Sequence, residues 1–484
     1  VETLWSFLPL NDYPLDILEM LWKKLLINQF HDIIPGSSIN LVYQTTHKEY
    51  EEIHKGCDDL INQSAKILFQ EDKDAFVLMN SLSYQWEGMV TLPESFHGYE
   101  ILNENGERVK VQTVGGNAEA FVSLSPLSLS SFKKGEQCNP GVSADGSLVL
   151  ENELIRYEFS DKGEMVSAFD KEVEREVLEG IGNVLSLYED RPNNWDAWDI
   201  DFFYRDALLE TADGSSKSSG SKGSISKQIE FTFKIGVSKI VQKIVLQPAS
   251  KRIDFKTKVD WKEKHKMLRV HFPVTVMSDQ ATFDIQYGYV KRNSHRNTSW
   301  DKAKFEVVGH KYADLSDHDY GVGLLNDCKY GYMVHDNLLD LNLLRSPSNP
   351  DPDADMGEHE FTYSLFPHKH DLIRSSVITE STCLNQGPIM LEGVSSDLEI
   401  PIKLSGQGLE LSVLKKAEKE DCWIVRIVET HGRNSKGTLH FKGSINECNL
   451  IEWENIDKKE NIQGKYLIGL SPFEIKTYKI HFSN

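Results

Sequence analysis

Uncharged and charged residues alternate without a break along residues 253–262, and this pattern places the strongest constraint on the fold. Its members are, in order, Ile253, Asp254, Phe255, Lys256, Thr257, Lys258, Val259, Asp260, Trp261 and Lys262. Successive side chains of a β-strand point to opposite faces. The pattern therefore predicts an antiparallel strand with one buried and one solvated face, whose lysines form ordinary surface and not a nucleic-acid patch.

Strand signals continue through most of the chain after Gly146. Residues 155–159 alternate in the same way, and a turn signal follows at 161–163. The strands are too many for one simple sandwich, so we expect a large two-sheet antiparallel β-sandwich over residues 146–395 and a smaller β domain over residues 396–484. The stretch DGSSKSSGSKGS at residues 213–224 cannot bury apolar surface and predicts a mobile loop.

Helical periodicity is confined to the beginning of the chain. Apolar residues recur at helical spacing between Pro14 and Ile34, and the following Pro-Gly pair predicts the end of this helix. A second helix, capped by Ser37 or Ser38, is expected to run to about Leu68. Because the connection is short, the two helices should form an antiparallel hairpin that belongs to a helical bundle.

The resulting fold class is mainly β, with an N-terminal helical hairpin. The helical segment occupies residues 1–70, and strand and turn signals over residues 71–140 predict a small β domain. The length of 484 residues exceeds one ordinary core and by itself suggests about three domains.

The chain is strongly acidic, with 53 Lys and Arg against 74 Asp and Glu and a net charge of −21 at pH 7. Such a field repels polyanions, which argues against nucleic acid and acidic membranes as partners and fits a neutral substrate. An acidic surface that serves solubility explains the charge equally well. No run approaches the roughly 20 apolar residues of a membrane span, and no signal peptide opens the sequence.

Six cysteines are spread over the chain without a CxxC pair, which is not the spacing of a disulfide framework. We expect buried free thiols in a reducing cytoplasm. The N-x-S/T matches at Asn62 and Asn297 are then chance occurrences and not glycosylation sites. The first residue is Val1, and apolar residues typical of a packed core follow it at once, so we expect the natural protein to start upstream.

The sequence NQFHDIIPGSS at residues 28–38 carries the clearest functional signal. On a helix that continues to Ile34, the residues Asn28, His31 and Asp32 share one face within apolar flanks. Two readings follow from the residues alone. The polar groups are satisfied by neighbouring helices, or a His31 ring nitrogen belongs to a metal or substrate site. One histidine is not a metal site, because zinc needs further protein ligands.

The longer string LLINQFHDIIPGSS, residues 25–38, resembles the signature of glycoside hydrolase family 38 α-mannosidases. Four later blocks are similar to bacterial and cytoplasmic-type members in the same order, at residues 188–206, 283–307, 321–347 and 349–368. The resemblance covers essentially the whole chain and implies a mutarotase-like sandwich in a cytoplasmic, bacterial protein. It further implies that His31 binds the catalytic zinc, that Asp32 hydrogen-bonds mannose hydroxyls, and that Asn28 supports both.

The block at residues 188–206 packs two indoles and three carboxylates into seven positions, 195–201. Indole faces stack on sugar rings, and carboxylates accept hydroxyl protons. Alternatively, the tryptophans are core residues and the aspartates cap turns. In the family a loop of the β domain reaches over the active site, so the resemblance implies substrate contacts for Trp195, Asp196, Trp198 and Asp199.

Arg345 ends an apolar strand immediately before a loop, and acidic residues crowd just after it. Their spacing does not match an EF-hand calcium loop. By the resemblance this region borders the sugar site, where Arg345 would orient a sugar hydroxyl or a catalytic carboxylate.

Family 38 enzymes are retaining α-mannosidases, which implies an enzymatic carboxylate nucleophile and a second carboxyl about 5 Å away. In the family the nucleophile and the other zinc ligands lie in an N-terminal α/β domain. Nothing in this chain matches that domain, since it has no HxD near a predicted strand. We therefore assign no catalytic residue here and expect one zinc ion that residues outside the chain complete.

Three hypotheses result. The chain is part of a zinc-dependent α-mannosidase, inactive alone, whose partners are a mannoside and its own N-terminal catalytic domain, with a homo-oligomer left open. Alternatively it is a non-catalytic carbohydrate-binding or interaction module on a mutarotase-like sandwich. The third alternative is a mutarotase or lyase with its entire active site in residues 146–395. The helix that carries His31 favours the first, because a free-standing sandwich has no reason to carry part of a zinc site.

Overall fold

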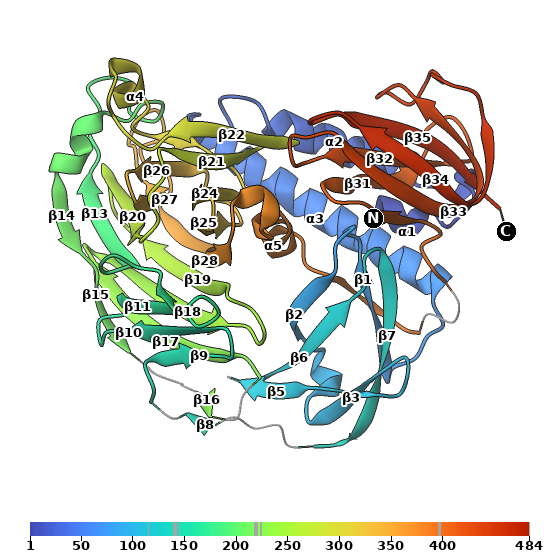
Figure 1. The fold of residues 1–484 in the computed structure, drawn as a ribbon, viewed down its shortest axis with the longest axis horizontal. Helices are drawn as coiled ribbons and strands as arrows, with labels where there is room; N and C mark the ends of the chain where they lie inside the picture. Colours follow the sequence, from blue (N-terminus) through green and yellow to red (C-terminus); the bar gives the residue numbers. More distant parts are fainter. Residues whose placement is uncertain are drawn as a thin grey trace. The chain divides into compact units, whose positions relative to one another are not determined.

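The computed structural model describes residues 1–114, 116–138, 143–144, 146–216, 221–222, 225–394 and 398–483 (Figure 1). The chain forms two compact units, each built from segments distant in sequence. The first unit contains Val1–Asn28, Thr46–Pro140 and Gln386–Asn484, and the second contains Gln29–Thr45 and Gly141–Asn385. The four domains expected from the sequence stay a prediction.

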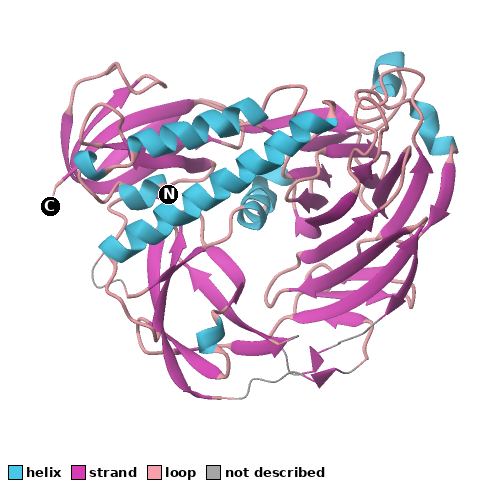
Figure 2. Cartoon of the chain, turned by 180° about the vertical axis from the view of Figure 1, so that it is seen from behind, coloured by secondary structure: helices cyan, strands magenta, loops and turns pink. Residues whose placement is uncertain are grey.

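Two long helices, α2 (Leu15–Asn28) and α3 (Asn40–Leu68), confirm the expected hairpin and lie side by side (Figure 2). Apolar side chains of α2, including Leu21, pack with Leu60 of α3 in one cluster. Gly56 permits the close approach, because a Cβ there would lie 2.9 Å from a methyl carbon of Leu21. Two short helices, α1 (Glu2–Trp5) and η1 (Leu10–Asp12), precede the hairpin, and the indole of Trp5 donates to the Leu60 carbonyl.

The first helix ends at Asn28, so its predicted continuation to Ile34 is wrong. Residues 31–36 form turns, and the amides of Ile33 and Ile34 both bond to the Phe30 carbonyl. The Asn28 side chain bonds back to the Lys24 carbonyl at 2.9 Å. Such side-chain bonds compete with helix propagation. The proline at position 35 also disfavours a helical conformation of the residue before it.

The rest of the first unit is antiparallel β-structure with one short helix, η2 (Glu94–Phe96). A five-stranded sheet has the order β29 (Ile389–Glu392), β1 (Ala75–Asn80), β7 (Ser128–Gln137), β3 (Tyr99–Asn103) and β4 (Arg108–Val109). A three-stranded sheet has the order β2 (Trp86–Thr91), β6 (Asn117–Leu124) and β5 (Val111–Val114). The C-terminal sheet has the order β30 (Lys403–Ser405), β33 (Ser435–Cys448), β35 (Ile475–Phe482), β32 (Trp423–Glu429) and β31 (Leu409–Lys416), with β34 (Glu460–Leu470) paired to β33.

The second unit is a large antiparallel β-sandwich, as predicted. Its nine-stranded sheet has the order β15 (Asp213–Ser216), β17 (Lys227–Ile235), β18 (Ser238–Leu246), β19 (Ile253–Trp261), β28 (Gly357–Lys369), β25 (Tyr320–Asn326), β24 (Tyr312–Ser316), β21 (Gln280–Ile285) and β22 (Gly288–Asn293). Its six-stranded sheet has the order β14 (Leu208–Thr211), β13 (Val184–Glu189), β20 (Lys266–Pro273), β27 (Leu338–Arg345), β26 (Gly331–His335) and β23 (Val307–Val308). The two sheets share one core, in which the rings of Phe255 and Phe272 lie 5.7 Å apart.

Smaller elements complete the second unit. A four-stranded sheet has the order β12 (Arg175–Glu176), β11 (Met165–Asp170), β10 (Ile155–Phe159) and β9 (Val149–Glu151), and β16 (Ser221–Lys222) pairs with β8 (Ser143–Ala144). The helices are α4 (Ser299–Ala303), α5 (Val377–Asn385), η3 (Phe202–Asp206) and η4 (Leu372–Arg374).

The alternating stretch predicted as a strand at residues 253–262 forms β19 up to Trp261, in the interior of the nine-stranded sheet (Figure 1). Lys256 and Lys258 are exposed as predicted. Asp254, expected on the solvated face, is buried instead, where it accepts bonds from Arg252 at 2.8 Å and from the Ser364 hydroxyl at 2.7 Å. Buried charges of this kind persist because partners satisfy them.

The predicted loop at residues 213–224 is wrong in part. Residues 213–216 form β15, which pairs with β17, and residues 221–222 form β16. Backbone hydrogen bonds to a neighbouring strand order such segments without any apolar side chain. Residues 217–220 and 223–224 lie outside the described residues.

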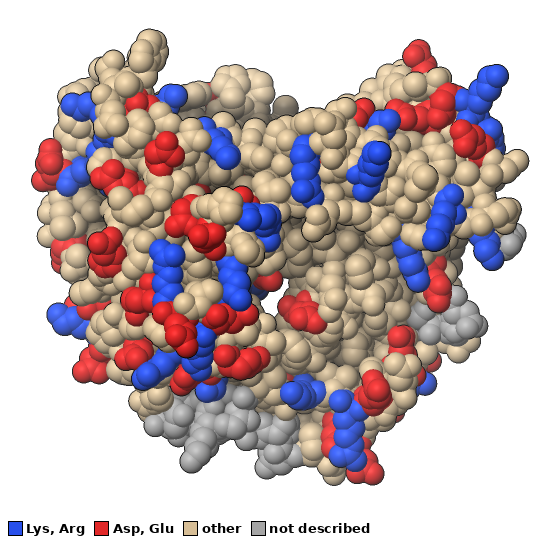
Figure 3. Space-filling view, viewed as in Figure 1, with Lys and Arg blue, Asp and Glu red and all other residues tan. Residues whose placement is uncertain are grey.

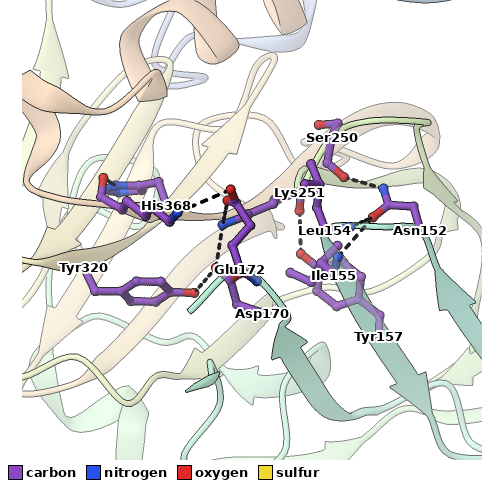
Figure 4. Close-up of polar contacts among 11 residues, drawn as sticks. Asn152, Leu154, Ile155, Tyr157, Asp170, Glu172, Ser250, Lys251, Tyr320 and His368 are labelled. Carbon is purple, nitrogen blue, oxygen red and sulfur yellow. Dashed lines mark hydrogen bonds and ion pairs between the residues drawn. The ribbon is translucent and has the colours of Figure 1, made fainter. Parts of the chain in front are cut away.

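A second buried charge cluster joins Asp170 of β11, Lys251 just before β19 and Tyr320 of β25 (Figure 4). Asp170 is fully buried and accepts from the Lys251 ammonium at 2.8 Å and from the Tyr320 hydroxyl at 2.9 Å. The Tyr157 hydroxyl donates to the Lys251 carbonyl at 2.6 Å. Each buried group thus has a partner of opposite charge or complementary polarity, which keeps the cluster compatible with burial.

The charged surface, the helices and the cysteines can each be compared with what the sequence predicted. On the face shown in Figure 3, acidic and basic side chains are interspersed over the tan background. No described helix combines the length and apolar character needed to cross a bilayer. The six cysteines form no disulfide with one another. The expected burial of the thiols holds for Cys422 and Cys448 but not for Cys328, which is exposed.

Candidate functional site

His31 and Asp32 lie in the turn after α2 and belong to the second unit. Their side chains are 69% and 41% exposed, and the Nε2 atom of His31 lies 3.5 Å from a carboxylate oxygen of Asp32. Because the helix ends at Asn28, the two residues lie on a turn and not on the helix that the sequence predicted. The rings of Phe30 and His31 are tilted against each other, with centroids 4.4 Å apart.

Asn28 does not accompany this pair. It is the last residue of α2, belongs to the first unit and is almost fully buried. Its side-chain nitrogen donates to a carboxylate oxygen of Glu49 on α3 at 2.7 Å. The same-face arrangement with His31 and Asp32 was wrong for the same reason, the early end of the helix.

Tyr43, on the first turns of α3, holds the conformation of the His31 turn. Its hydroxyl accepts the Ser38 amide at 2.8 Å and lies 3.3 Å from the Asp32 carbonyl, to which it can donate. Burial raises the Tyr43 pKa, so the hydroxyl keeps its proton for this bond. Asn40 donates to Asp351 at 3.1 Å, which ties the start of α3 to the loop after β27.

Trp195 and Trp198 lie on one tight turn with largely exposed indoles, 75% and 56%. Trp195 has a φ of 58°, and the Trp198 amide bonds to its carbonyl at 2.8 Å. The ring centroids of Trp198 and His31 are 6.3 Å apart. The structure thus brings together two segments that are far apart in sequence, and it excludes the alternative that these tryptophans are core residues.

Arg345, at the end of β27, stabilises the same turn by hydrogen bonds to its backbone. Its Nε atom donates to the buried carboxylate of Asp190 at 2.7 Å. Its Nη2 atom donates to the carbonyls of Asp199 at 2.7 Å and Asp196 at 3.2 Å. Burial raises the pKa of Asp190, and the adjacent Arg345 guanidinium opposes that shift. The guanidinium is therefore engaged with the protein itself.

Asp196 connects the tryptophan turn to the loop after β27. One of its carboxylate oxygens accepts the amides of Ser348 at 2.6 Å and Asn349 at 3.1 Å. The other lies 3.5 Å from the Nδ1 atom of His265. The carboxyl group of Asp199 bonds locally, to the Ile200 amide at 2.9 Å. Asp196 thus lies where it holds two loops in register beside the exposed indoles.

We predict that Asp196→Ala loosens this arrangement. Two loop amides lose their acceptor, which costs about 1–3 kcal/mol in the free energy of unfolding. Urea unfolding followed by tryptophan fluorescence measures the loss. The matched control is Asp353→Ala, because Asp353 forms an exposed ion pair with Lys264 in the same loop region and should cost less than about 1 kcal/mol. Equal losses in the two variants contradict the bracing role of Asp196.

The described residues offer an incomplete set of metal ligands at this site. His31 supplies an exposed imidazole and Asp32 a neighbouring carboxylate. Neither belongs to a group of three or more histidine, cysteine or acidic side chains close enough to share an ion, within the part of the chain that the structure describes. A zinc ion needs at least three protein ligands. These residues therefore fit one side of a zinc site.

Three residues that position the site were not identified from the sequence. Tyr43 and His265 lie outside the matched blocks, and Asp190 lies within the block at residues 188–206, which was the one signal that could have indicated it. Their partners are 5 to 155 residues away along the chain, as in the pairs Tyr43–Ser38 and Asp190–Arg345. Such contacts arise where loops from different parts of the chain pack together, and no sequence pattern links those loops.

Three family models match the chain. The Alpha mannosidase middle domain matches residues 1–68, the Glycosyl hydrolases family 38 C-terminal domain matches residues 150–353, and the Glycosyl hydrolases family 38 C-terminal beta sandwich domain matches residues 408–478. They follow one another along the chain, and the first includes His31 and Asp32, whereas the second includes the tryptophan turn and Arg345.

Curated relatives and solved structures agree with these models. The chain is 32% identical to alpha-mannosidase G of Dictyostelium discoideum, over 96% of this chain and 48% of that protein, and 32% identical to alpha-mannosidase 2C1 of Mus musculus, over 96% and 45%. An alpha-mannosidase from Enterococcus faecalis V583 shares the fold with a TM-score of 0.80 at 16% identity, over 99% of this chain and 65% of that one. The chain spans about half the length of the curated relatives it matches, and it belongs to glycoside hydrolase family 38, whose C-terminal domains it matches.

Proposed function

We propose that this chain is the middle and C-terminal part of a zinc-dependent, retaining α-mannosidase that hydrolyses terminal α-mannosides in the cytoplasm. The observation that carries the proposal is the exposed His31–Asp32 pair beside the exposed indole of Trp198. A histidine, a carboxylate and an aromatic face together can bind a metal and a sugar. The relatives named as alpha-mannosidases support the substrate class.

In this proposal His31 is one zinc ligand, and the remaining ligands and the nucleophile come from an N-terminal catalytic domain. Zinc, when bound, polarises sugar hydroxyls and stabilises charge that develops in the transition state. Asp32 accepts a hydroxyl proton of the mannose ring. Trp195 and Trp198 supply apolar faces for the sugar, and Asp199 accepts a further hydroxyl.

Arg345 and Asp196 have a different role in this proposal from the one the resemblance implies. The guanidinium bonds to Asp190 and to two carbonyls, and the Asp196 carboxylate accepts two amides. Both groups therefore act on the sugar through the loop that they hold. They are positioning residues for Trp198 and Asp199.

The exposed apolar residues around His31 support a partner that covers them. Phe30 and Ile34 flank the pair and are both more than half exposed, as is Trp198. Apolar side chains gathered at one place on a surface are typical of an interface. The N-terminal domain of the same enzyme is the occupant that we propose.

The test compares two proteins, this chain alone and the chain joined to its N-terminal catalytic domain. We expect bound zinc and hydrolysis of p-nitrophenyl α-mannoside in the joined protein only, because the chain alone lacks the nucleophile and enough ligands. Elemental analysis and release of nitrophenol measure the two properties. Turnover by the chain alone would contradict the assignment of the nucleophile and the remaining zinc ligands to the N-terminal domain. A joined protein without turnover would contradict the proposed activity.

A carbohydrate-binding module is the second candidate, favoured by the high exposure of Trp195. It predicts that the chain alone binds mannosides without zinc and that Trp195→Ala abolishes this binding. Quenching of tryptophan fluorescence by methyl α-mannoside distinguishes the two, since the mannosidase proposal expects sugar binding to need the completed zinc site.

A further inference from the structure

A second group of metal-ligand side chains lies in the C-terminal sheet of the first unit, outside the site described above (Figure 1). Strands β32 and β35 pair with Trp423 opposite Ile480. The residues next to this pair, Cys422 and His481, are thereby cross-strand neighbours on one face. Glu420 lies two residues before Cys422, in the hairpin between β31 and β32, which the bond from the Ala417 amide to the Cys422 carbonyl closes at 2.9 Å.

The register brings three different donor atoms together. A carboxylate oxygen of Glu420, the sulfur of Cys422 and a ring nitrogen of His481 all lie within 4.8 Å of one another. Ligands that share a zinc ion lie about 3–4 Å apart, given bond lengths of about 2.0–2.3 Å. Glu420 is exposed and Cys422 is buried, so the Glu420 side chain can change its rotamer and bring its carboxylate to an ion bound by the other two residues.

The burial of this group leaves one donor without a protein partner. The sulfur belongs to a residue that is 1% exposed, and one ring nitrogen of His481, Nδ1, is buried and makes no hydrogen bond with any residue that the structure describes. A buried polar atom without a partner costs free energy that a ligand can recover. Burial also lowers the pKa of His481, so the ring is neutral near pH 7 and keeps a lone pair for binding.

We propose that Glu420, Cys422 and His481 form a binding site for a divalent transition-metal ion, with Zn²⁺ as the expected occupant. The mixed oxygen, sulfur and nitrogen donor set matches the borderline softness of zinc and not the all-oxygen preference of Mg²⁺ or Ca²⁺. Three protein ligands leave a fourth tetrahedral position for water. This site is independent of His31 and of the proposed mannosidase activity.

Binding displaces a proton from the thiol. Burial raises the pKa of Cys422 to about 12, so the metal-free residue carries S–H. The ion forms the S–metal bond as the S–H bond breaks, and the proton leaves to water with no change of oxidation state. Glu420 already accepts an ion pair from Lys479 in the metal-free protein. Lys479 is therefore a competitor for the carboxylate that the ion needs.

The competing lysine supplies the sharpest test. Replacing Lys479 by methionine keeps an apolar stem of similar length and removes the competing charge. We expect Lys479→Met to bind metal at least about tenfold more tightly than the unmodified chain, whereas Cys422→Ser and His481→Ala bind it at least about tenfold more weakly. A role of Lys479 in folding alone would not strengthen metal binding.

The measurement is a titration of the full chain with Co²⁺, followed by displacement with Zn²⁺. A thiolate-to-cobalt charge-transfer band in the near ultraviolet reports a cysteine ligand and therefore not the His31 site, and its loss in Cys422→Ser assigns the ligand to Cys422. The matched control is Cys448→Ser. Cys448 is also buried in this sheet, but its sulfur contacts the Thr477 carbonyl at 3.6 Å. His31→Ala is the second control, and both controls should keep the band.

Two outcomes would overturn the proposal. One is the absence of a thiolate band at saturating Co²⁺ in the unmodified chain. The other is a band that persists in Cys422→Ser or disappears in Cys448→Ser, which would assign binding to another thiol. Circular dichroism of each variant confirms that a lost band reflects a lost ligand, and Lys479→Met keeps the test open where a ligand variant fails to fold.

Discussion

Hydrolysis of a mannoside by the joined enzyme is expected to fall by more than about a hundredfold when His31 is replaced by alanine, a loss of about 2.7 kcal/mol in transition-state stabilisation. The expected cause is loss of a zinc ligand, so bound zinc should fall in parallel. His31 is largely exposed and its only charged neighbour within ion-pair distance is Asp32, among the residues that the structure describes. Its removal should therefore leave the fold intact.

The control for this variant is His318→Ala. His318 lies in the second unit with a side chain that is 82% exposed, against 69% for His31, and it likewise pairs with the aspartate that follows it, Asp319. We expect unchanged zinc and unchanged turnover. Asp32→Asn should retain zinc and lose activity, since in the proposal the Asp32 carboxylate binds sugar. An unaltered zinc content in His31→Ala would show that another residue fills the proposed position.

Replacing Asp340 by alanine is expected to lower the free energy of unfolding by roughly 3–5 kcal/mol, because it leaves a buried arginine without its main partner. Arg269 is fully buried, its Nε atom donates to Asp340 at 2.6 Å, and its Nη1 atom lies 3.1 Å from Glu306. Its guanidinium also lies 5.4 Å from the ring centre of Tyr204. Glu306 alone cannot satisfy the rigid fork of five donors.

Urea unfolding of Asp340→Ala and of a variant that removes all the buried charges distinguishes two quantities. They are the cost of leaving one buried charge unpaired and the net contribution of the ion pairs to the free energy of unfolding. The triple variant Arg269→Met, Asp340→Leu, Glu306→Gln should recover most of the loss, because all three interacting charges are replaced together by uncharged groups of similar size and none is left unpaired. Glu360→Ala is the control, since its pair with Lys258 is about 70% exposed on both sides and should contribute less than about 1 kcal/mol. A single Asp340 variant as stable as that control would contradict the argument.

The elements whose signals are local were predictable. The alternation at residues 253–262 predicted β19, and the periodicity up to Leu68 predicted α3, because side-chain direction alternates with fixed periods in strands and helices. The predicted end of the first helix was wrong, because its apolar periodicity competes there with a hydrogen bond from a side chain to the backbone. The helix expected to reach Ile34 ends at Asn28, whose side chain bonds to the Lys24 carbonyl.

The candidate site was predictable in its members but not in its arrangement. His31 and Asp32 came from a resemblance of one segment, and Trp198 and Arg345 from blocks that lie far along the chain. That Trp198 faces His31 at 6.3 Å, while Arg345 is bonded to Asp190 and to carbonyls, depends on loop packing. Loops take their conformation from tertiary contacts more than from their own periodicity.

The sequence by itself determined that this protein is mainly β with a helical hairpin at its start, and that it resembles the C-terminal part of a family 38 enzyme. Both conclusions rest on patterns within contiguous segments. Only the tertiary structure decided that His31 is exposed while Asn28 is buried, that Arg345 and Asp196 hold a loop, and that Glu420, Cys422 and His481 meet. The physical reason is that strand register and loop packing join residues whose separation along the chain carries no period.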